Sequence, residues 1–124
     1  MNLPDSGQRS TYSTGAQRDN QIGRGRYDLI SPYALKDLAV RLELGALKYS
    51  ERNWERGMNA GRYANAIYRH LNQLIMGDNT EDHIGAILFN AMALSHTRAM
   101  IQKGIYPVDF WDFPEYEKEL TSES

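Results

Sequence analysis

The stretch from Thr80 to Gly104 constrains the fold most, because it reads as one long helix with apolar residues on two faces. One face carries Ile84, Ile87, Leu88, Ala91 and Ala99, and the other carries Ala86, Phe89, Ala93 and Met100. Thr80 can cap its start, and Glu81 and Asp82 in the first turn suit the helix dipole. A helix that is apolar on two faces is buried on two sides. In a chain of 124 residues, we expect a partner subunit to cover one of them.

Two more helices are predicted before this one. Ser31 can cap the first, and Pro32 suits its first turn. An apolar stripe follows at helical spacing, formed by Leu35, Leu38, Ala39, Leu42 and Ala46. The second helix is expected from about Ala60 to Met76, and its apolar line is Tyr63, Ile67, Leu71 and Leu74. No alternating run of β-branched residues predicts a strand.

The predicted fold class is therefore all-α. We expect a helical bundle of three principal helices within residues 27–104. An irregular N-terminal arm is predicted over residues 1–26, where glycines fall among polar residues. An aromatic C-terminal tail over residues 105–124 is expected to pack on the domain or on a partner subunit. Because of the two-faced helix, we expect oligomerisation to a homodimer or homotetramer to complete the bundle.

Composition excludes several classes of protein. The chain has no cysteine, which excludes thiolate zinc sites and cysteine nucleophiles and fits a reducing cytoplasm. Its net charge of -2 argues against a nucleic-acid polymer as partner, because phosphate backbones need a basic face. No apolar run approaches the ~20 residues of a membrane span, so no membrane partner is expected. Carboxylates outnumber histidines, 16 to 3, and they favour hard ions such as Mg²⁺ or Mn²⁺.

A polar loop from Glu43 to Gly57 is the first candidate site. It gathers long polar side chains around one tryptophan, namely Glu43, Lys48, Tyr49, Glu51, Arg52, Asn53, Trp54 and Glu55. A loop that only connects two helices would not need so many. We expect this loop to face a second acidic cluster, Asp78 to His83, across a phosphate-bearing substrate. Glu43 is expected at the half-buried rim of the apolar stripe, either as a metal ligand or as a solvated flank charge.

Charge and shape suggest the roles of these residues. Carboxylates on facing helices hold divalent ions in all-α hydrolases, and such an ion activates water for attack on phosphate. The candidate metal ligands are Glu43 and Asp82, then Glu55 and Glu81, with Asp78 as a further candidate. The candidate catalytic residues are Glu43, Lys48 and Asp82. The candidate substrate-binding residues are Arg18, Arg26, Tyr49, Arg52, Asn53, Trp54, Arg69 and Asn90. For Glu81 and Asp82, helix capping is the competing role.

Some of these residues have a plainer interpretation. Arg18 and Arg26 belong to the N-terminal arm, which is either a disordered terminus or a segment that wraps an anion. His83 and Asn90 share one line of the third helix, where they either form a structural network or line the site. His70 falls inside an apolar line, where a histidine is more often a hydrogen-bonded core residue than a ligand.

Longer motifs carry a resemblance to a known family. They are STGAQRD (13–19), GRGRYDLISPYAL (23–35), GALKYSERNWERG (45–57), RH (69–70), GDNTEDHIGAILFNAMAL (77–94) and SH (95–96). This series resembles the phage-encoded dATP/dGTP diphosphohydrolases, the MazZ-like members of the all-α MazG-type pyrophosphohydrolases. The resemblance implies hydrolysis of a purine deoxynucleoside triphosphate to monophosphate and pyrophosphate, with magnesium or manganese. In some phages this activity supports 2-aminoadenine DNA synthesis, which places it in the host cytoplasm.

One departure from that pattern concerns the metal ligands. The broader MazG pattern has a Glu-Glu-x-x-Glu run and a later Glu-x-x-Asp, whereas here Glu43 stands alone and Glu81 and Asp82 are adjacent. Ligands are therefore not carried over by matching. Two alternatives stay open. One is a non-catalytic nucleotide-binding adaptor. The other is a histidine–aspartate metallophosphohydrolase using His70, Asp82, His83 and His96, although the order Asp82-His83 reverses the dipeptide which that class needs.

Overall fold

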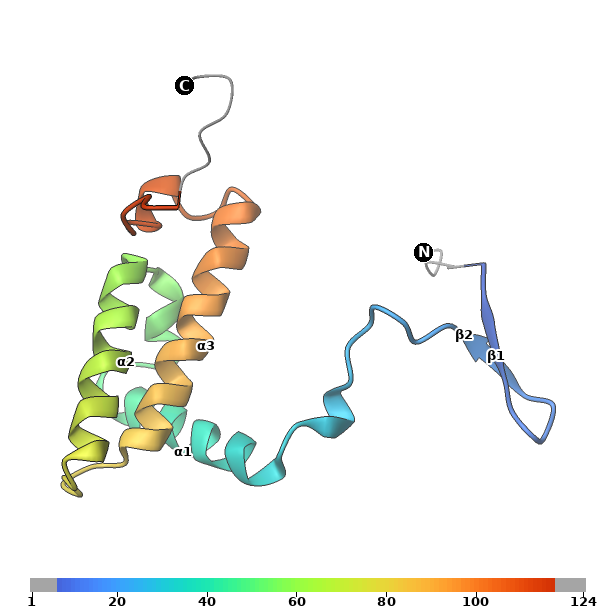
Figure 1. Cartoon of the computed structure of the whole chain (residues 1–124), viewed down its shortest axis with the longest axis horizontal. Coiled ribbons are helices and arrows are strands. Elements are labelled where there is room, and N and C mark those ends of the chain that lie inside the picture. Colours follow the sequence, from blue (N-terminus) through green and yellow to red (C-terminus); the bar gives the residue numbers. More distant parts are fainter. Residues whose placement is uncertain (1–6, 118–124) are drawn as a thin grey trace. The chain divides into compact units, whose positions relative to one another are not determined.

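The computed structural model describes residues 7–117 and divides into two compact units, one ending at Ile30 and one beginning at Ser31 (Figure 1). Residues 1–6 and 118–124, the outer ends of the predicted arm and tail, lie outside the described residues. The prediction of three principal helices is confirmed, and all three lie in the second unit.

The first unit contains a β-hairpin, which corrects both the all-α assignment and the irregular arm. Strand β1 (Arg9–Thr11) pairs antiparallel with β2 (Gln17–Asp19), and Ser10 lies opposite Arg18. The turn closes through hydrogen bonds of 2.8 Å and 2.9 Å, from the Gly15 amide to the Tyr12 carbonyl and from the Tyr12 amide to the Ala16 carbonyl. The strands are three residues long and mostly exposed, so they lack the apolar alternation by which a strand is recognised.

Helix α1 spans Pro32–Lys48 and begins as its sequence predicts. The Ser31 hydroxyl accepts a 3.3 Å hydrogen bond from the Ala34 amide, and the proline occupies the first turn. The half-buried positions of α1 are Ala34, Leu38, Arg41, Leu42, Gly45 and Ala46. Leu35 and Ala39 of the expected stripe are exposed. The half-buried side of α1, which packs against α3, begins at Ala34 and not at Leu35.

Helices α2 (Ala60–Ile75) and α3 (His83–Gln102) form an antiparallel hairpin. Gly77 ends the first of them with a φ of +86°, as a left-handed glycine commonly does. The buried positions of the two helices mirror each other about this turn. On α2 they are Ala60, Tyr63 and His70, and on α3 the mirror positions are Ala93, Asn90 and His83.

The start of α3 differs from the prediction. Asp82, not Thr80, is the N-terminal cap, and its carboxylate accepts a 3.1 Å hydrogen bond from the Gly85 amide. Thr80 instead donates to the Asp78 carboxylate at 2.9 Å. Thr80 and Asp82 are both residue types that cap helices well. Asp82 is the cap because it directly precedes the first helical residue, His83.

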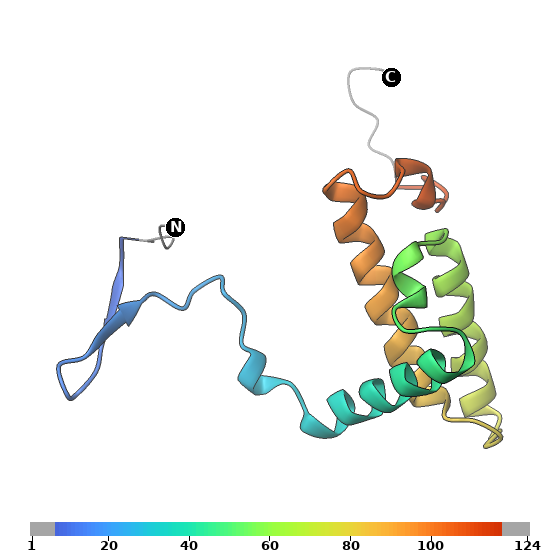
Figure 2. The ribbon, with the colours of Figure 1, turned by 180° about the vertical axis from the view of Figure 1, so that it is seen from behind.

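Helix α3 packs against both α1 and α2 (Figure 2). Its buried positions, Ala86 and Ala93 among them, lie on one apolar face, whereas Ile84 (50% exposed) and Ala91 on the other apolar face remain exposed. The contacts with α1 and α2 therefore leave part of that second face uncovered within residues 7–117. The structure does contain one helix, α3, with the length and mean hydropathy (1.2) of a membrane span. This is weak evidence for a membrane, because a core helix of a bundle passes the same test.

Small residues form the centre of the bundle. The buried hydrophobic residues of the described chain are Ala60, Tyr63, Ala86, Ala93 and Tyr106. None of its leucine, isoleucine, valine, methionine or phenylalanine side chains is fully buried between residues 7 and 117. Alanines let α2 and α3 approach closely, while the large aliphatic side chains lie at the rims and on outer faces.

The segment after α3 folds back onto the loop that precedes α2. The Tyr106 hydroxyl donates a 2.6 Å hydrogen bond to the Glu55 carbonyl, and the Asp112 carboxylate accepts a 2.7 Å bond from the Gly61 amide. The Tyr106 and Phe110 rings close over Gly57, where an added Cβ would lie 3.0–3.2 Å from them. The polar loop is therefore held by residues about fifty positions away.

Candidate functional site

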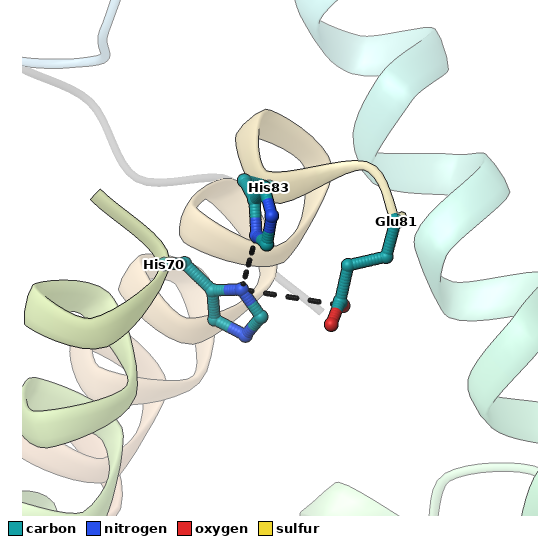
Figure 3. A group of neighbouring side chains, drawn as sticks. All are labelled: His70, Glu81 and His83. Carbon is teal, nitrogen blue, oxygen red and sulfur yellow. Dashed lines mark hydrogen bonds and ion pairs between the residues drawn. The ribbon is translucent and has the colours of Figure 1, made fainter. Parts of the chain in front are cut away.

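A cluster of polar side chains lies where α2 ends and α3 begins (Figure 3). His70 comes from the last turns of α2, and His83 is the first residue of α3. Both are buried, with 4% and 2% of their surface exposed. Their Nδ1 atoms are 2.9 Å apart, and the Glu81 carboxylate reaches to 4.0 Å from His70 Nδ1. The tight turn between two antiparallel helices brings these three residues together.

Asp78 determines which ring nitrogen of His83 carries a proton. Its carboxylate lies 2.5 Å from His83 Nε2 and also accepts from Thr80. These hydrogen bonds, the one from His83 first, lower the pKa of Asp78 below its usual value, so the carboxylate is ionised. An ionised carboxylate can only accept, so His83 Nε2 carries the proton. In the neutral ring, Nδ1 of His83 then presents a lone pair to His70.

Arg41 and Arg69 both supply positive charge to the cluster. From the half-buried line of α1, Arg41 forms a 3.2 Å ion pair with Glu81. Burial lowers the pKa of His70 most, and this outweighs the opposing effect of Glu81. Asp78 and Glu81 bring two carboxylates to the cluster, beside the two imidazoles. The cluster thus gathers side chains that can serve as ligands of a cation.

The donor set fits a metal ion. One ligand atom from each of His70, Glu81 and His83 can be chosen so that all lie within 4.8 Å of one another. Two imidazole nitrogens and a carboxylate are the ligands of many catalytic zinc and non-haem iron sites. Of the carboxylates that the sequence suggested as ligands, Glu81 alone belongs to this group of three, while His70 and His83 were suggested only by the histidine–aspartate alternative.

The polar loop lies at the opposite end of α3. The Trp54 ring packs edge-on against His96, with ring centroids 4.9 Å apart. His96 is about 20 Å along α3 from His83 at ~1.5 Å per residue. Contrary to expectation, Trp54 therefore does not face the cluster. The histidine–aspartate alternative meets the same obstacle, because His96 is too far from His70 and His83 to share one ion.

Within the loop, charged side chains pair with their neighbours. Arg52 adopts a left-handed backbone conformation with a φ of +57°, and its guanidinium lies 2.5 Å from the Glu55 carboxylate. Lys48 Nζ lies 5.2 Å from the centroid of the exposed Tyr49 ring. Asn53 and Trp54 are half-buried in the short 3₁₀ helix Asn53–Arg56.

Other predicted site residues are dispersed. Glu43 is exposed rather than half-buried, because at ~100° per residue it lies about 200° from the α3-facing Arg41. Arg69 is exposed on α2. Asn90 is buried and donates to the Ala86 carbonyl at 2.8 Å, which satisfies it within its own helix. Asp82 is placed by its capping bond at the mouth of α3, next to the cluster.

Two predicted substrate residues belong to the first unit. Arg18 lies in β2, and Arg26 forms a two-pronged pair with Asp28 at 2.7 Å and 2.9 Å. Asp19 similarly pairs with Arg24 at 2.6 Å. These local ion pairs give the segment a defined structure without an external anion.

The sequence interpretation missed two features of the cluster. It grouped His70 and His83 only within the histidine–aspartate alternative and did not use their spacing. His70 lies six residues before Met76 and His83 six residues after Gly77, so a hairpin of two helices brings them level with each other. It also passed over Arg41, whose position beside Leu42 in the α3-facing line was a usable signal.

Comparison with known proteins supplies the family. No curated protein and no solved structure gives a significant match to the chain. The family model described as "dATP/dGTP diphosphohydrolase, N-terminal" matches residues 14–105. This range contains the polar loop, all three helices and the His70–Glu81–His83 cluster. The match covers well over half of the sequence, and the chain belongs to the dATP/dGTP diphosphohydrolase family, a family of enzymes that hydrolyse deoxynucleoside triphosphates.

Proposed function

We propose that the chain hydrolyses dGTP or dATP to the monophosphate and pyrophosphate with the help of a divalent cation. The family match over residues 14–105 carries this proposal, since it spans every helix and the loop between α1 and α2. The resemblance to phage-encoded enzymes supports a place in phage nucleotide metabolism, in the host cytoplasm, where the dGMP formed could enter 2-aminoadenine DNA synthesis.

Charge explains the need for the cation. A triphosphate brings about four negative charges, and carboxylates would repel it unless an ion lay between them. Mg²⁺ or Mn²⁺ accepts such oxygen ligands. We assign the nucleotide-bound ion first to Asp82, because Glu43 faces away from α3, Glu55 is paired with Arg52 and Glu81 is paired with Arg41. Lys48 and Arg69 are the exposed cations proposed to offset charge on the phosphates.

The base is proposed to stack on an aromatic ring of the loop. Tyr49 exposes 65% of its surface, whereas Trp54 is half-buried against His96. An exposed ring offers a free face to a purine, so we favour Tyr49 for this role, with Asn53 beside it to contact polar edges of the nucleotide.

The product distribution tests the reaction type. If water attacks the α-phosphate, dGTP and Mg²⁺ are expected to yield dGMP and pyrophosphate in equal amounts, measured by anion-exchange chromatography. Release of inorganic phosphate with dGDP would contradict this reaction. Tripolyphosphate release would instead favour chemistry of the histidine–aspartate type.

We also propose that the enzyme is a homodimer or homotetramer. Support comes from Ile84 and Ala91, exposed on one apolar face of α3, and from the outer faces of α1 and α2, which expose large apolar side chains. These are Tyr33, Leu35, Val40, Leu44 and Leu47 on α1, and Tyr68, Leu71, Leu74 and Ile75 on α2. Apolar patches of this kind mark interaction surfaces, and a homo-oligomer is the simplest partner.

Light scattering at micromolar concentration tests this assembly. We expect a mass of two or four chains, reduced in Leu47→Glu or Ile75→Glu, whose side chains are 79% and 76% exposed. The matched control is Tyr116→Glu, since Tyr116 is 87% exposed but lies outside the helices. A monomeric wild-type protein would rule out the assembly.

A further inference from the structure

Two buried histidines at the α2–α3 turn have Nδ1 atoms directed at each other, with a carboxylate beside them. We propose that His70, His83 and Glu81 bind one transition-metal ion of the Zn²⁺ or Fe²⁺ class, at a site separate from the Mg²⁺ that accompanies the nucleotide. Imidazole nitrogen suits these ions, whereas Mg²⁺ prefers six oxygen ligands and keeps several of its waters.

The geometry of the nitrogens fits one ion. Metal–nitrogen distances are about 2.1 Å, so two nitrogen ligands of one ion lie about 3.0 Å apart at right angles and about 3.4 Å apart at the tetrahedral angle of zinc, a separation that small ring rotations can reach. The Nδ1 atoms of His70 and His83 are 2.9 Å apart. The Glu81 carboxylate is 4.0 Å from His70 Nδ1, and its side chain is 43% exposed, so rotation can bring it into contact with the ion. The exposed carboxylate also marks the side from which an ion enters.

Asp78 prepares His83 to act as a ligand. Because its carboxylate holds the proton on Nε2 at 2.5 Å, the Nδ1 lone pair of His83 points into the cluster. Histidines that bind metals usually donate their other nitrogen to such a carboxylate, which fixes the tautomer. Asp78 is thus a positioning residue for this site and not one of its ligands.

Without the ion, a proton holds the two rings together. His70 Nδ1–H donates to the His83 Nδ1 lone pair, the only direction that the His83 tautomer allows. When the ion binds, the His70 proton moves to Nε2 and both Nδ1 atoms coordinate. The ion therefore replaces one hydrogen bond with coordinate bonds.

The experiment uses the full chain, from which a chelator has removed bound metal. No nucleotide is added, so metal binding is measured independently of the hydrolytic activity. Zn²⁺, Co²⁺ or Mg²⁺ is added, and bound metal is counted after desalting. Thermal unfolding and the visible absorption of Co²⁺ are recorded in parallel. We expect one Zn²⁺ or Co²⁺ per chain and a raised Tm, since a ligand that binds the folded state stabilises it, and no such effect from equal Mg²⁺.

Variants identify the ligands. Glu81→Gln keeps the shape of an exposed side chain and is expected to weaken Zn²⁺ binding at least tenfold. His83→Asn is expected to abolish binding. Asp78→Asn is expected to weaken it about 10- to 100-fold and to change the Co²⁺ spectrum, as loss of an outer carboxylate does. The matched control, His96→Asn, removes the histidine that packs on Trp54 and should bind as wild type does.

Several results would overturn the site. They are failure of the wild type to retain Zn²⁺ or Co²⁺, retention undiminished in both Glu81→Gln and Asp78→Asn, or equal loss in His96→Asn. If His83→Asn does not fold, the two carboxylate variants still decide the matter. The hydrolysis of dGTP, assayed separately with Mg²⁺, bears on the proposed function and not on this ion.

Discussion

Asp82→Asn is expected to lower dGTP hydrolysis on the order of a hundredfold while Tm stays near that of wild type. The side-chain oxygen that accepts from the Gly85 amide at 3.1 Å is kept, and Asn caps a helix about as well as Asp. Only the negative charge is lost, and this charge is what we propose binds the cation that accompanies the nucleotide. Loss of a group that stabilises charge in the transition state typically costs a hundredfold or more in turnover.

Turnover at saturating Mg²⁺ and thermal unfolding are the paired measurements. Asp82→Ala serves as the comparator, since it removes both cap and charge and should lose about 1 kcal/mol of folding stability as well. Turnover close to wild type in Asp82→Asn would leave Asp82 as a helix cap alone. The nucleotide-bound ion would then need ligands other than Asp82.

Gly57→Ala is expected to destabilise the fold by about 3 kcal/mol or more. Its φ of +89° and ψ of +149° fall in a region that is almost restricted to glycine and costs on the order of 1–3 kcal/mol for other residues. The new methyl group would also meet the Phe110 and Tyr106 rings at 3.0–3.2 Å, and such overpacking costs about 1–3 kcal/mol. In a domain of this size, Tm should fall by more than about 10 °C.

Gly77→Ala is the matched control for that measurement. Its φ of +86° is nearly the same, but no atom lies within 4 Å of an added Cβ. We expect a loss of only about 1–2 kcal/mol, from the backbone alone. Equal losses in the two variants, by thermal unfolding, would show that the aromatic contacts over Gly57 are not tight.

The helices could be predicted because local signals repeat along each of them. Ser31-Pro32 at the start of α1, Gly77 at the end of α2 and the apolar spacing of α3 all act within a few residues. The β-hairpin could not, because hydrogen bonds across a four-residue turn hold it, and no apolar face marks its strands. Thr80 was chosen over Asp82 as the cap because both are good caps and residue type cannot rank them.

The candidate site was only partly predictable. Composition directed attention to carboxylates, yet the cluster at the α2–α3 turn depends on two of only three histidines. Their pairing is tertiary information, since His70 and His83 meet only when α2 and α3 pack. Glu43 was expected at a half-buried rim because the apolar stripe was centred about one residue away from the line that α1 presents to α3.

The hydrogen bonds that hold the polar loop also affect the order in which parts of the chain fold. Tyr106 to Glu55 and Gly61 to Asp112 each join residues 51 positions apart, whereas the α2–α3 hairpin closes locally. Local contacts form sooner than distant ones, because closing a long segment of chain costs more entropy. On the ribosome, the histidine cluster can therefore assemble before Tyr106 and Asp112, which hold the polar loop, have emerged. The polar loop is thus completed after the histidine cluster.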